Sequence, residues 1–352
     1  PGQVDEVVKM GLENWVIQQL NASLSDDSLT ERLKKYDAIN FTNKQVNQYF
    51  PQRPKLIRMA IDEGFIDKDS VGISGKKEYK DKLEEYMKQK GFRPESELFR
   101  QFINQKILRA VYTNNQLQEV MTDFWFNHFN VSITKNQCAL YIPAYERDVI
   151  RPNVFGSFQN ILLATAKSPA MLLYLDNFSS SGTNQAFDGI INKRLVQQQT
   201  KKIKQSQGLN ENYAREIMEL HTMGVDGGYT QSDVTQAARV LTGWTIYPFT
   251  DYGAAAGMKK LLEKFPEEKL AERGFVHEGD FLFTINRHDD DEKIVLGKKF
   301  TEGGGYNEGV ELLSMLAHHQ STAKFISKKL AVRFVNDNPP QSLIDKMAKI
   351  FL

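Results

Sequence analysis

The sequence has one cysteine, almost no net charge and no long apolar run. Because Cys138 is the single cysteine among 352 residues, an intrachain disulfide and a cysteine-rich zinc module are excluded. Lys and Arg total 45 and Asp and Glu total 44, so the formal charge of +1 argues against a dedicated nucleic-acid binder. No stretch of about 18 or more apolar residues occurs, so we predict no membrane span.

Nucleotide-binding motifs and strand signals are also scarce. The Gly-Lys-Ser/Thr pattern of a P-loop and the Gly-x-Gly-x-x-Gly pattern of a dinucleotide site are both absent. Partial alternation over 274–286 predicts a short hairpin, and residues 293–300 suit a companion strand. We therefore expect a small β element over 274–300 in a mainly α-helical protein.

Helical periodicity accounts for most of the chain. Apolar residues recur at three- and four-residue spacings over 4–20, 97–129, 145–166, 308–335 and 342–352. We expect breaks near 112–115 and 318–320, and Pro152 should end or kink the helix that contains it. After the second break, Ser321 or Thr322 is expected to cap the next helix.

One segment differs in composition from the rest. Residues 178–207 are rich in Ser, Gln and Lys and predict a flexible insertion. Within it, Lys201, Lys202 and Lys204 form a basic cluster that either binds an anion or, as such runs usually do, faces solvent. We expect this insertion and the β element to interrupt a single large helical domain over 1–352.

Residues 210–244 combine the clearest helix boundaries with the most chemically capable side chains. Asparagines open a helix, a glycine closes it, and a turn over 226–228 leads into a second helix from Thr230. Thr230 and Asp233 fit a capping box with Asp in place of Glu. We interpret the turn first as a tight joint between two helices, and second as an anion site at a helix N-terminus.

The first helix of this hairpin is expected to have two faces. Four residues fall at spacings that suit burial: Tyr213, Ile217, Leu220 and Gly224. Four others form one polar stripe: Asn212, Arg215, Glu216 and Glu219.

The polar stripe has two interpretations. Glu216 and Glu219 form a carboxylate pair one turn apart, which suits a divalent metal or an acid/base pair. Arg215 can instead form an ordinary helix ion pair with Glu219. His221 lies off the stripe, so it either receives partners from another element or is a half-buried structural histidine.

His128 is the second candidate position. It lies among aromatic residues in FWFNHFN, where it is either a ligand or general base, or a core histidine. A core histidine needs a hydrogen-bond partner, for which Asn127, Asn130 and Asp123 are available. The hairpin supplies three further binding candidates: Asn212, Asp226 and Trp244.

His288 and Asp289 open the acidic run over 288–292. Its oxygens suit calcium or magnesium, so these two residues are weak metal candidates. The run lacks the alternating ligands and central glycine of an EF-hand, and a solvated turn is the alternative interpretation.

Several segments resemble one family in their sequences and in their order. They are QLQEVMTDFWFNHFNV (116–131), YERDVIRP (145–152), SPAMLLYLDN (168–177), the hairpin over 210–244, HDDDEKIVLG (288–297) and STAKFISKKLAVRFVNDNPP (321–340). On these residues the chain resembles the bacterial family called domain of unknown function 1800. One departure is Ser168, where the family often has histidine, and this weakens any scheme that uses the position as a ligand.

The resemblance implies a large, mainly helical bacterial protein that is often exported and often encoded beside a sulfatase-like family. It implies no substrate and no catalytic residues. Members usually begin with an Arg/Gly-rich segment ahead of this start and continue past Leu352, so we expect both ends to be trimmed. We predict a periplasmic or cell-surface location, although no signal-peptide pattern opens this chain.

Two classes of function remain. The first is a structural or assembly factor whose motif residues hold helices together. The second is a metal-assisted or acid/base hydrolase of a cell-envelope or extracellular polymer, with a divalent metal as the one cofactor considered. Its polar cleft would use Arg215, Glu216, Glu219 and His221, joined by His128, His288 and Asp289. We expect an envelope protein or polymer as partner, and no nucleic acid.

Overall fold

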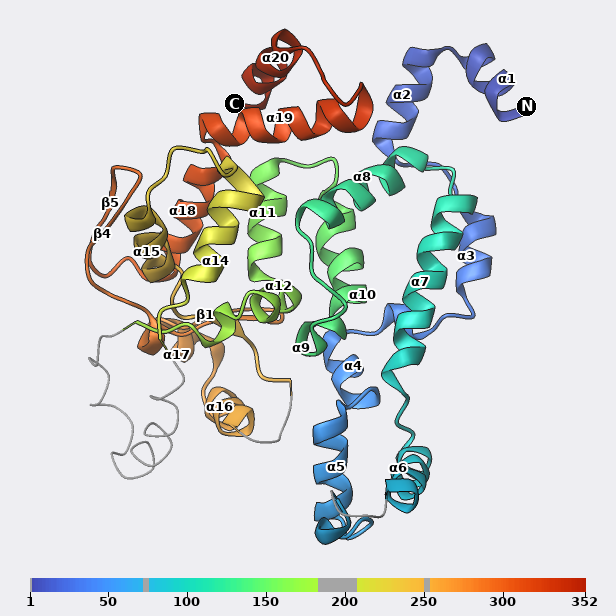
Figure 1. Ribbon diagram of the computed structural model, residues 1–352, viewed down its shortest axis with the longest axis vertical. Coiled ribbons are helices and arrows are strands. Elements are labelled where there is room, and N and C mark those ends of the chain that lie inside the picture. The colour runs from blue at the N-terminus through green and yellow to red at the C-terminus, as the bar shows by residue number, and fades with distance from the viewer. Residues whose placement is uncertain (1, 72–75, 183–207, 250–253) are drawn as a thin grey trace. The chain divides into compact units, whose positions relative to one another are not determined.

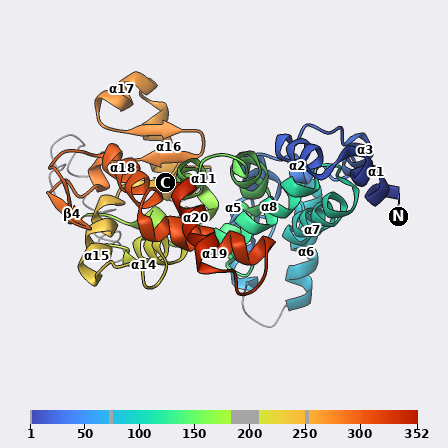
Figure 2. The ribbon, with the colours of Figure 1, turned by 90° about the horizontal axis from the view of Figure 1, so that it is seen from above.

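The computed structural model describes residues 2–71, 76–182, 208–249 and 254–352, and it is mainly helical, as predicted (Figures 1 and 2). The chain forms two compact units. Unit 1 comprises residues 1–124 and 139–151, and unit 2 comprises residues 125–138 and 152–352. Most of the predicted insertion, including the basic cluster Lys201, Lys202 and Lys204, lies outside the described residues. The single domain over 1–352 stays a prediction.

Unit 1 is built from helices. They are α1 (Gly2–Met10), α2 (Leu12–Asn21), α3 (Asp27–Leu33), η1 (Ala38–Asn40), α4 (Asn43–Tyr49), α5 (Arg53–Asp62), η2 (Lys68–Ser70), α6 (Lys76–Lys90), α7 (Glu95–Tyr112), α10 (Ile142–Ala144) and the π-helix η3 (Tyr145–Ile150). The chain passes into unit 2 within α8 (Gln116–His128). The predicted break at 112–115 is confirmed. The single helix predicted over 4–20 is wrong, because Gly11 adopts a φ of 85° and separates α1 from α2.

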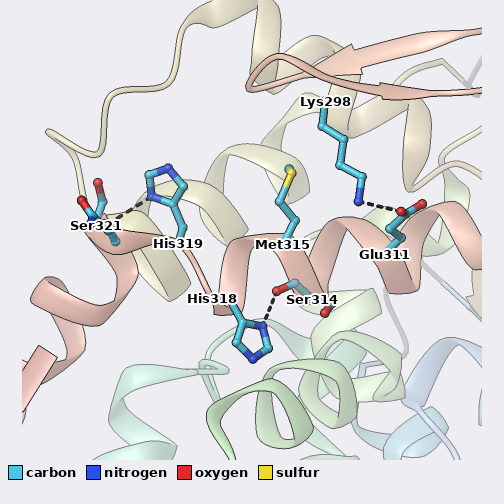
Figure 3. Close-up of a pocket in the computed structure, with 8 residues that line it drawn as sticks. Lys298, Glu311, Ser314, Met315, His318, His319 and Ser321 are labelled. Carbon is cyan, nitrogen blue, oxygen red and sulfur yellow. Dashed lines mark hydrogen bonds and ion pairs between the residues drawn. The ribbon is translucent and has the colours of Figure 1, made fainter. Parts of the chain in front are cut away.

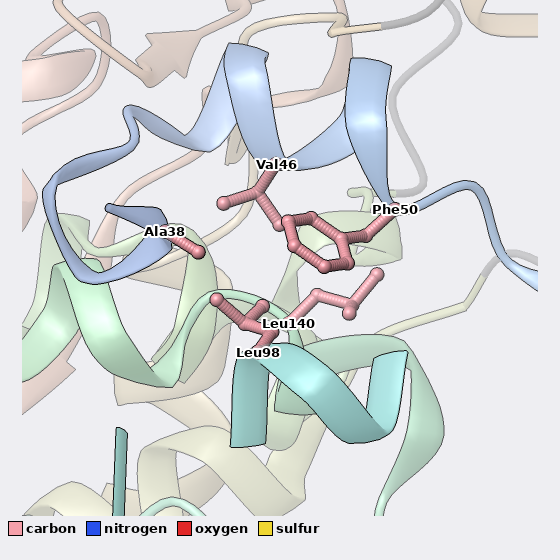
Figure 4. Close-up of a cluster of buried hydrophobic side chains, with 5 residues drawn as sticks. All are labelled: Ala38, Val46, Phe50, Leu98 and Leu140. Carbon is pink, nitrogen blue, oxygen red and sulfur yellow. The ribbon is translucent and has the colours of Figure 1, made fainter. Parts of the chain in front are cut away.

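The core of unit 1 is formed by residues that are distant from one another in sequence. Figure 4 shows the side chains of one cluster pointing toward one another: Ala38, Val46, Phe50, Leu98 and Leu140. All five are at most 1% exposed, so the cluster joins η1, α4 and α7 to the segment at Leu140. A second cluster pairs α5 with α6, where Leu56 and Ala60 pack with Leu83 and Tyr86. Apolar burial therefore sets the arrangement of these helices.

Unit 2 contains most of the segments that carry the family resemblance. Its helical elements are α9 (Asn136–Ala139), η4 (Arg151–Asn153), α11 (Phe158–Lys167), α12 (Pro169–Tyr174), η5 (Asn177–Ser179), α14 (Glu211–Glu216), η6 (Ile217–Met223), α15 (Gln231–Val240), α16 (Ala254–Glu263), α17 (Glu267–Glu272), η7 (Ile285–Arg287), α18 (Tyr306–Ala317), α19 (Gln320–Phe334) and α20 (Gln341–Phe351). The residues of α9 and η4 next to the unit boundaries belong to unit 1. In Figure 1, α19 crosses the ends of α18 and of η6, which continues the helix labelled α14.

The helix boundaries in unit 2 follow most of the predictions. The interruption at Pro152 and the break at 318–320 are both confirmed. The expected cap is wrong, because α19 is capped by His319, whose side chain accepts a hydrogen bond from the backbone N–H of Ser321. Imidazole nitrogen serves here as the acceptor that a hydroxyl usually provides.

The β structure of unit 2 forms two small sheets. Strands β2 (Val276–Glu278) and β3 (Phe281–Phe283) form the predicted hairpin, and β1 (Trp244–Ile246) pairs with the other edge of β3. The companion strand predicted over 293–300 is wrong. That segment forms its own antiparallel hairpin, β4 (Lys293–Val295) with β5 (Lys298–Phe300). The backbone N–H of Leu296 in its turn donates to Asp233, which ties this hairpin to α15.

Candidate functional site

The hairpin over 210–244 begins and ends where its caps predict. The side chain of Asn210 accepts from the backbone N–H of Asn212 and starts α14. Thr230 and Asp233 form the predicted capping box at the start of α15. The joint between the helices begins at Gly224, which has a φ of 84°, and a Cβ there would lie 3.1 Å from the ring of Phe325 on α19. The turn therefore fixes the hairpin against α19.

The predicted faces of this helix fail in its second half, because residues 217–223 form the π-helix η6. The hydroxyl of Thr222 donates to the carbonyl oxygen of Ile217, five residues earlier, at 2.7 Å, which fits the wider turn. As a result Leu220, expected to be buried, is 46% exposed. His221, expected to be half-buried, is 6% exposed.

The polar stripe is only half-buried and makes contacts within the hairpin. Arg215 donates to Gln231 at 2.6 Å and lies 3.8 Å from Glu211, so its ion-pair partner is Glu211 and not Glu219. Glu219 instead accepts from the hydroxyl of Tyr229 at 3.1 Å. Burial, followed by the nearby charge of Glu219, raises the pKa of Glu216. Asn212 and Asp226 are exposed.

A second arrangement joins three segments that carry the family resemblance. Nε2 of His128, at the end of α8, lies 2.9 Å from the backbone oxygen of His221 in η6. Nδ1 of the same ring lies 2.8 Å from Nζ of Lys329 on α19. We call His128, His221 and Lys329 the basic triad. Because a carbonyl oxygen only accepts, His128 is protonated on Nε2, and its bare Nδ1 accepts from Lys329.

Aromatic rings surround the basic triad. The ring of His128 lies near Trp125, Phe129, Phe158 and Phe325, with centroid distances of 5.5, 4.6, 6.4 and 6.2 Å. Burial, then the charge of Lys329, lowers the pKa of His128 well below its usual value and that of His221 to about 3. Burial also lowers the pKa of Lys329. All three groups are therefore biased toward their neutral forms.

His288 and Asp289 lie in a separate buried network. Nδ1 of His288 lies 3.0 Å from the carbonyl oxygen of Thr242, and its Nε2 lies 3.4 Å from Oε2 of Glu308. The guanidinium of Arg239 donates two hydrogen bonds, each 2.9 Å long, to the carboxylate of Asp289. Together these contacts connect α15, the segment before β4 and α18.

The central ion pair of this network is Lys293 with Glu308. Their atoms Nζ and Oε2 are 2.6 Å apart, and the two side chains are 0% and 4% exposed. Nζ of Lys293 also donates to the backbone oxygen of Asp289. Burial alone would raise the pKa of Glu308, but His288 and Lys293 hold it below its usual value.

These contacts bear on the weak metal prediction for His288 and Asp289. Both oxygens of Asp289 accept from Arg239, and Glu308 accepts from Lys293, so protein cations hold the positions that a metal would take. Within the described residues, no three His, Cys, Asp or Glu side chains converge as metal ligands do. The oxygen donors at this place therefore fit ion pairs better than a divalent metal.

Trp244, a predicted binding residue, lies in the core of unit 2. Its ring is fully buried and stacks on Tyr306, with centroids 5.6 Å apart. Gly309 on α18 faces it so closely that an added Cβ would lie 2.4 Å from Cζ2 and 2.7 Å from Nε1 of Trp244. The tryptophan thus fixes the distance between β1 and α18.

We expect Gly309→Ala to lower the free energy of unfolding by about 1–3 kcal/mol. Alanine is the better helix former by about 1 kcal/mol, but the rigid ring of Trp244 leaves no room for a methyl group. Urea unfolding measures the change. The matched control is Gly257→Ala in α16, where nothing lies within 4 Å of an added Cβ. Equal effects of the two substitutions would contradict the close packing at Gly309.

An open hollow lies elsewhere in unit 2. Figure 3 shows it between the end of α18, the start of α19 and Lys298 of β5. Its volume is about 810 Å³. Lys298 is paired with Glu311, His318 with the backbone of Ser314, and His319 caps α19, so these four side chains already have partners. None of the predicted site residues lines it.

The structure thus divides seven of the ten predicted site residues among three places. Arg215, Glu216 and Glu219 lie on the outer side of the hairpin, His128 and His221 in the basic triad, and His288 and Asp289 in the ion-pair network. Sequence reasoning missed four residues: Arg239, Lys293, Glu308 and Lys329. The last lies in STAKFISKKLAVRFV, a segment of the resemblance, but nothing in that run of lysines distinguishes it from its neighbours.

None of the described helices combines the length and the apolar character that a bilayer crossing requires. No curated protein and no solved structure gives a significant match to the chain. The family model described as "Protein of unknown function (DUF1800)" matches residues 1–352, so the match also includes the first hundred residues, where the motifs resemble the family only loosely. The chain therefore belongs to the DUF1800 family over its whole length.

Proposed function

We propose that the protein is an exported bacterial structural or assembly factor that binds an envelope protein or polymer. The observation that supports this proposal is the ion-pair network of unit 2. There, Arg239 with Asp289 and Lys293 with Glu308 use the charges of the HDDDEKIVLG segment to join α15 and α18 to β4. Such buried pairs specify one arrangement of elements. On this view the shared motifs serve to build a scaffold.

The alternative is an acid/base hydrolase that uses Glu216 and Glu219. It is favoured by one observation, the raised pKa of Glu216 beside a second carboxylate that accepts from Tyr229. Two carboxyl groups held side by side, one of them with a raised pKa, are the parts of an acid/base pair. Both groups are half-buried, so solvent reaches them.

One experiment separates the two functions. The purified chain and its Glu216→Gln, Glu219→Gln double variant are mixed with isolated cell-envelope polymer. Sedimentation of the protein with the polymer and release of soluble fragments are both measured, with and without chelator. Glu211→Gln on the same helix is the matched control, since Glu211 contacts Arg215, Gln231 and Thr235 within the hairpin.

A structural factor is expected to sediment with the polymer, release no fragments and behave alike in all variants. Fragments that appear with the wild type and vanish only in the double variant would overturn our proposal in favour of the hydrolase. If the wild type does not bind the polymer, an envelope polymer is not its partner. Cross-linking to envelope proteins then tests the remaining partner class.

A further inference from the structure

Lys329 differs from Lys293, which also lies in unit 2. Lys293 is fully buried and faces the carboxylate of Glu308 at 2.6 Å. Lys329 is half-buried and has no carboxylate partner in the described part of the chain. Its amino group instead donates to Nδ1 of His128 and lies 5.2 Å from the ring centre of Phe325.

The elements packed against α19 supply no counter-ion either. These are η6, α18, α20 and the unit 2 part of α8, and their acidic and basic side chains are His128, Glu219, His221, Glu308, Glu311, Asp345, Lys346 and Lys349. None of them forms an ion pair with Lys329 within the described ranges. The lysine therefore has imidazole and aromatic rings for neighbours, and with no carboxylate beside it among the described residues its burial favours the neutral amine.

We propose that Lys329 is a nucleophilic amine that condenses with the carbonyl group of an aldehyde or ketone, with His128 as its proton acceptor. A neutral amine is the reactive form, and lysines become nucleophilic where desolvation or a neighbouring base removes their charge. The burial that lowers the pKa of Lys329 acts in the same direction. This goes beyond the proposed function, because an assembly factor and a hydrolase both work without such an amine.

The step balances with the groups at hand. The lone pair of Nζ forms a bond to the carbonyl carbon while the π electrons of the C=O bond move to oxygen. Both protons of the neutral amine then reach that oxygen, which leaves as water when the imine forms. Nδ1 of His128 lies 2.8 Å from Nζ and relays these protons, while its Nε2–H stays bonded to the carbonyl of His221. The product is an imine between Lys329 and the carbonyl compound.

The test is reductive trapping on the intact wild-type chain. The protein is treated at pH 7 with propanal and sodium cyanoborohydride, and labelling of each lysine is followed by peptide mass spectrometry. Lys324 and Lys328 are internal controls, because both lie exposed on the same helix. Lys329 is expected to react faster than either, because burial lowers its pKa and leaves more of its amine neutral at pH 7.

Two further measurements separate a reactive amine from a merely accessible one. The labelling rate of Lys329 should level off at a lower pH than that of Lys328. His128→Phe, which removes Nδ1 but keeps an aromatic ring, should slow labelling at Lys329 and leave Lys328 unchanged. If Lys329 in the wild type reacts no faster than Lys328, or with the same pH dependence, the proposal is wrong, whether or not the variant folds.

Discussion

Replacing Lys293 by Met is expected to lower the free energy of unfolding by about 3–5 kcal/mol. The substitution leaves the carboxylate of Glu308 4% exposed and without its ammonium partner, which lies 2.6 Å away. An isolated buried charge is costly because the interior replaces little of the hydration it loses. His288, 3.4 Å from the same oxygen, offsets part of this cost only if it takes up a proton.

A second pair between the β4–β5 hairpin and α18 provides the control. Lys298 of β5 and Glu311 of α18 also lie 2.6 Å apart, but their side chains are 37% and 54% exposed. Lys298→Met is therefore expected to change stability by about 1 kcal/mol or less. Urea unfolding of both variants, at one pH and salt concentration, gives the comparison.

The double variant Lys293→Met, Glu308→Leu completes the test. With both charges removed, much of the lost stability should return, because no unpaired charge remains inside. The coupling energy from this double-mutant cycle isolates the pair from the other contacts of each residue. A Lys293→Met variant that loses no more stability than Lys298→Met would contradict the burial of this pair.

The sequence predicted those features of the fold that depend on neighbouring residues. The break between α7 and α8, the end of a helix at Pro152 and the capping box of Thr230 with Asp233 all follow from local signals, and all are confirmed. The π-helix η6 was not predictable by the same means. Its single extra residue per turn leaves no mark in a 3.6-residue pattern, so Leu220 was assigned to the wrong face.

Pairings between distant segments were the second kind of feature that the sequence did not predict. The hairpin β2–β3 was predicted from its own residues, whereas its third strand, β1, comes from the end of the helical hairpin about 30 residues earlier. Both carboxylates of the polar stripe were identified, yet the partner of His128 was not. That partner is Lys329, 201 residues further along the chain, and no local pattern can indicate such a contact.

Acidification from pH 7 to pH 5 is expected to lower the free energy of unfolding by about 2 kcal/mol through His221 alone. His221 is 6% exposed, and burial followed by the charge of Lys329 lowers its pKa in the fold to about 3. In the unfolded chain its pKa is near the ordinary 6.5. Between these two values the unfolded state binds a proton that the native state does not.

The sign of the effect follows from this difference in bound protons. Stability rises with pH wherever the unfolded state holds more protons, so the contribution of His221 is complete above about pH 6.5 and is lost progressively down to about pH 3. His221→Leu should remove this contribution, because leucine has no ionisable group and suits a position that is 6% exposed. The variant should therefore lose about 2 kcal/mol less than the wild type between pH 7 and pH 5.

His318→Gln, at an exposed position, should keep the wild-type slope of unfolding free energy against pH. If His221→Leu keeps it as well, His221 is not held neutral, and the basic triad does not have the environment from which the reactivity of Lys329 is inferred.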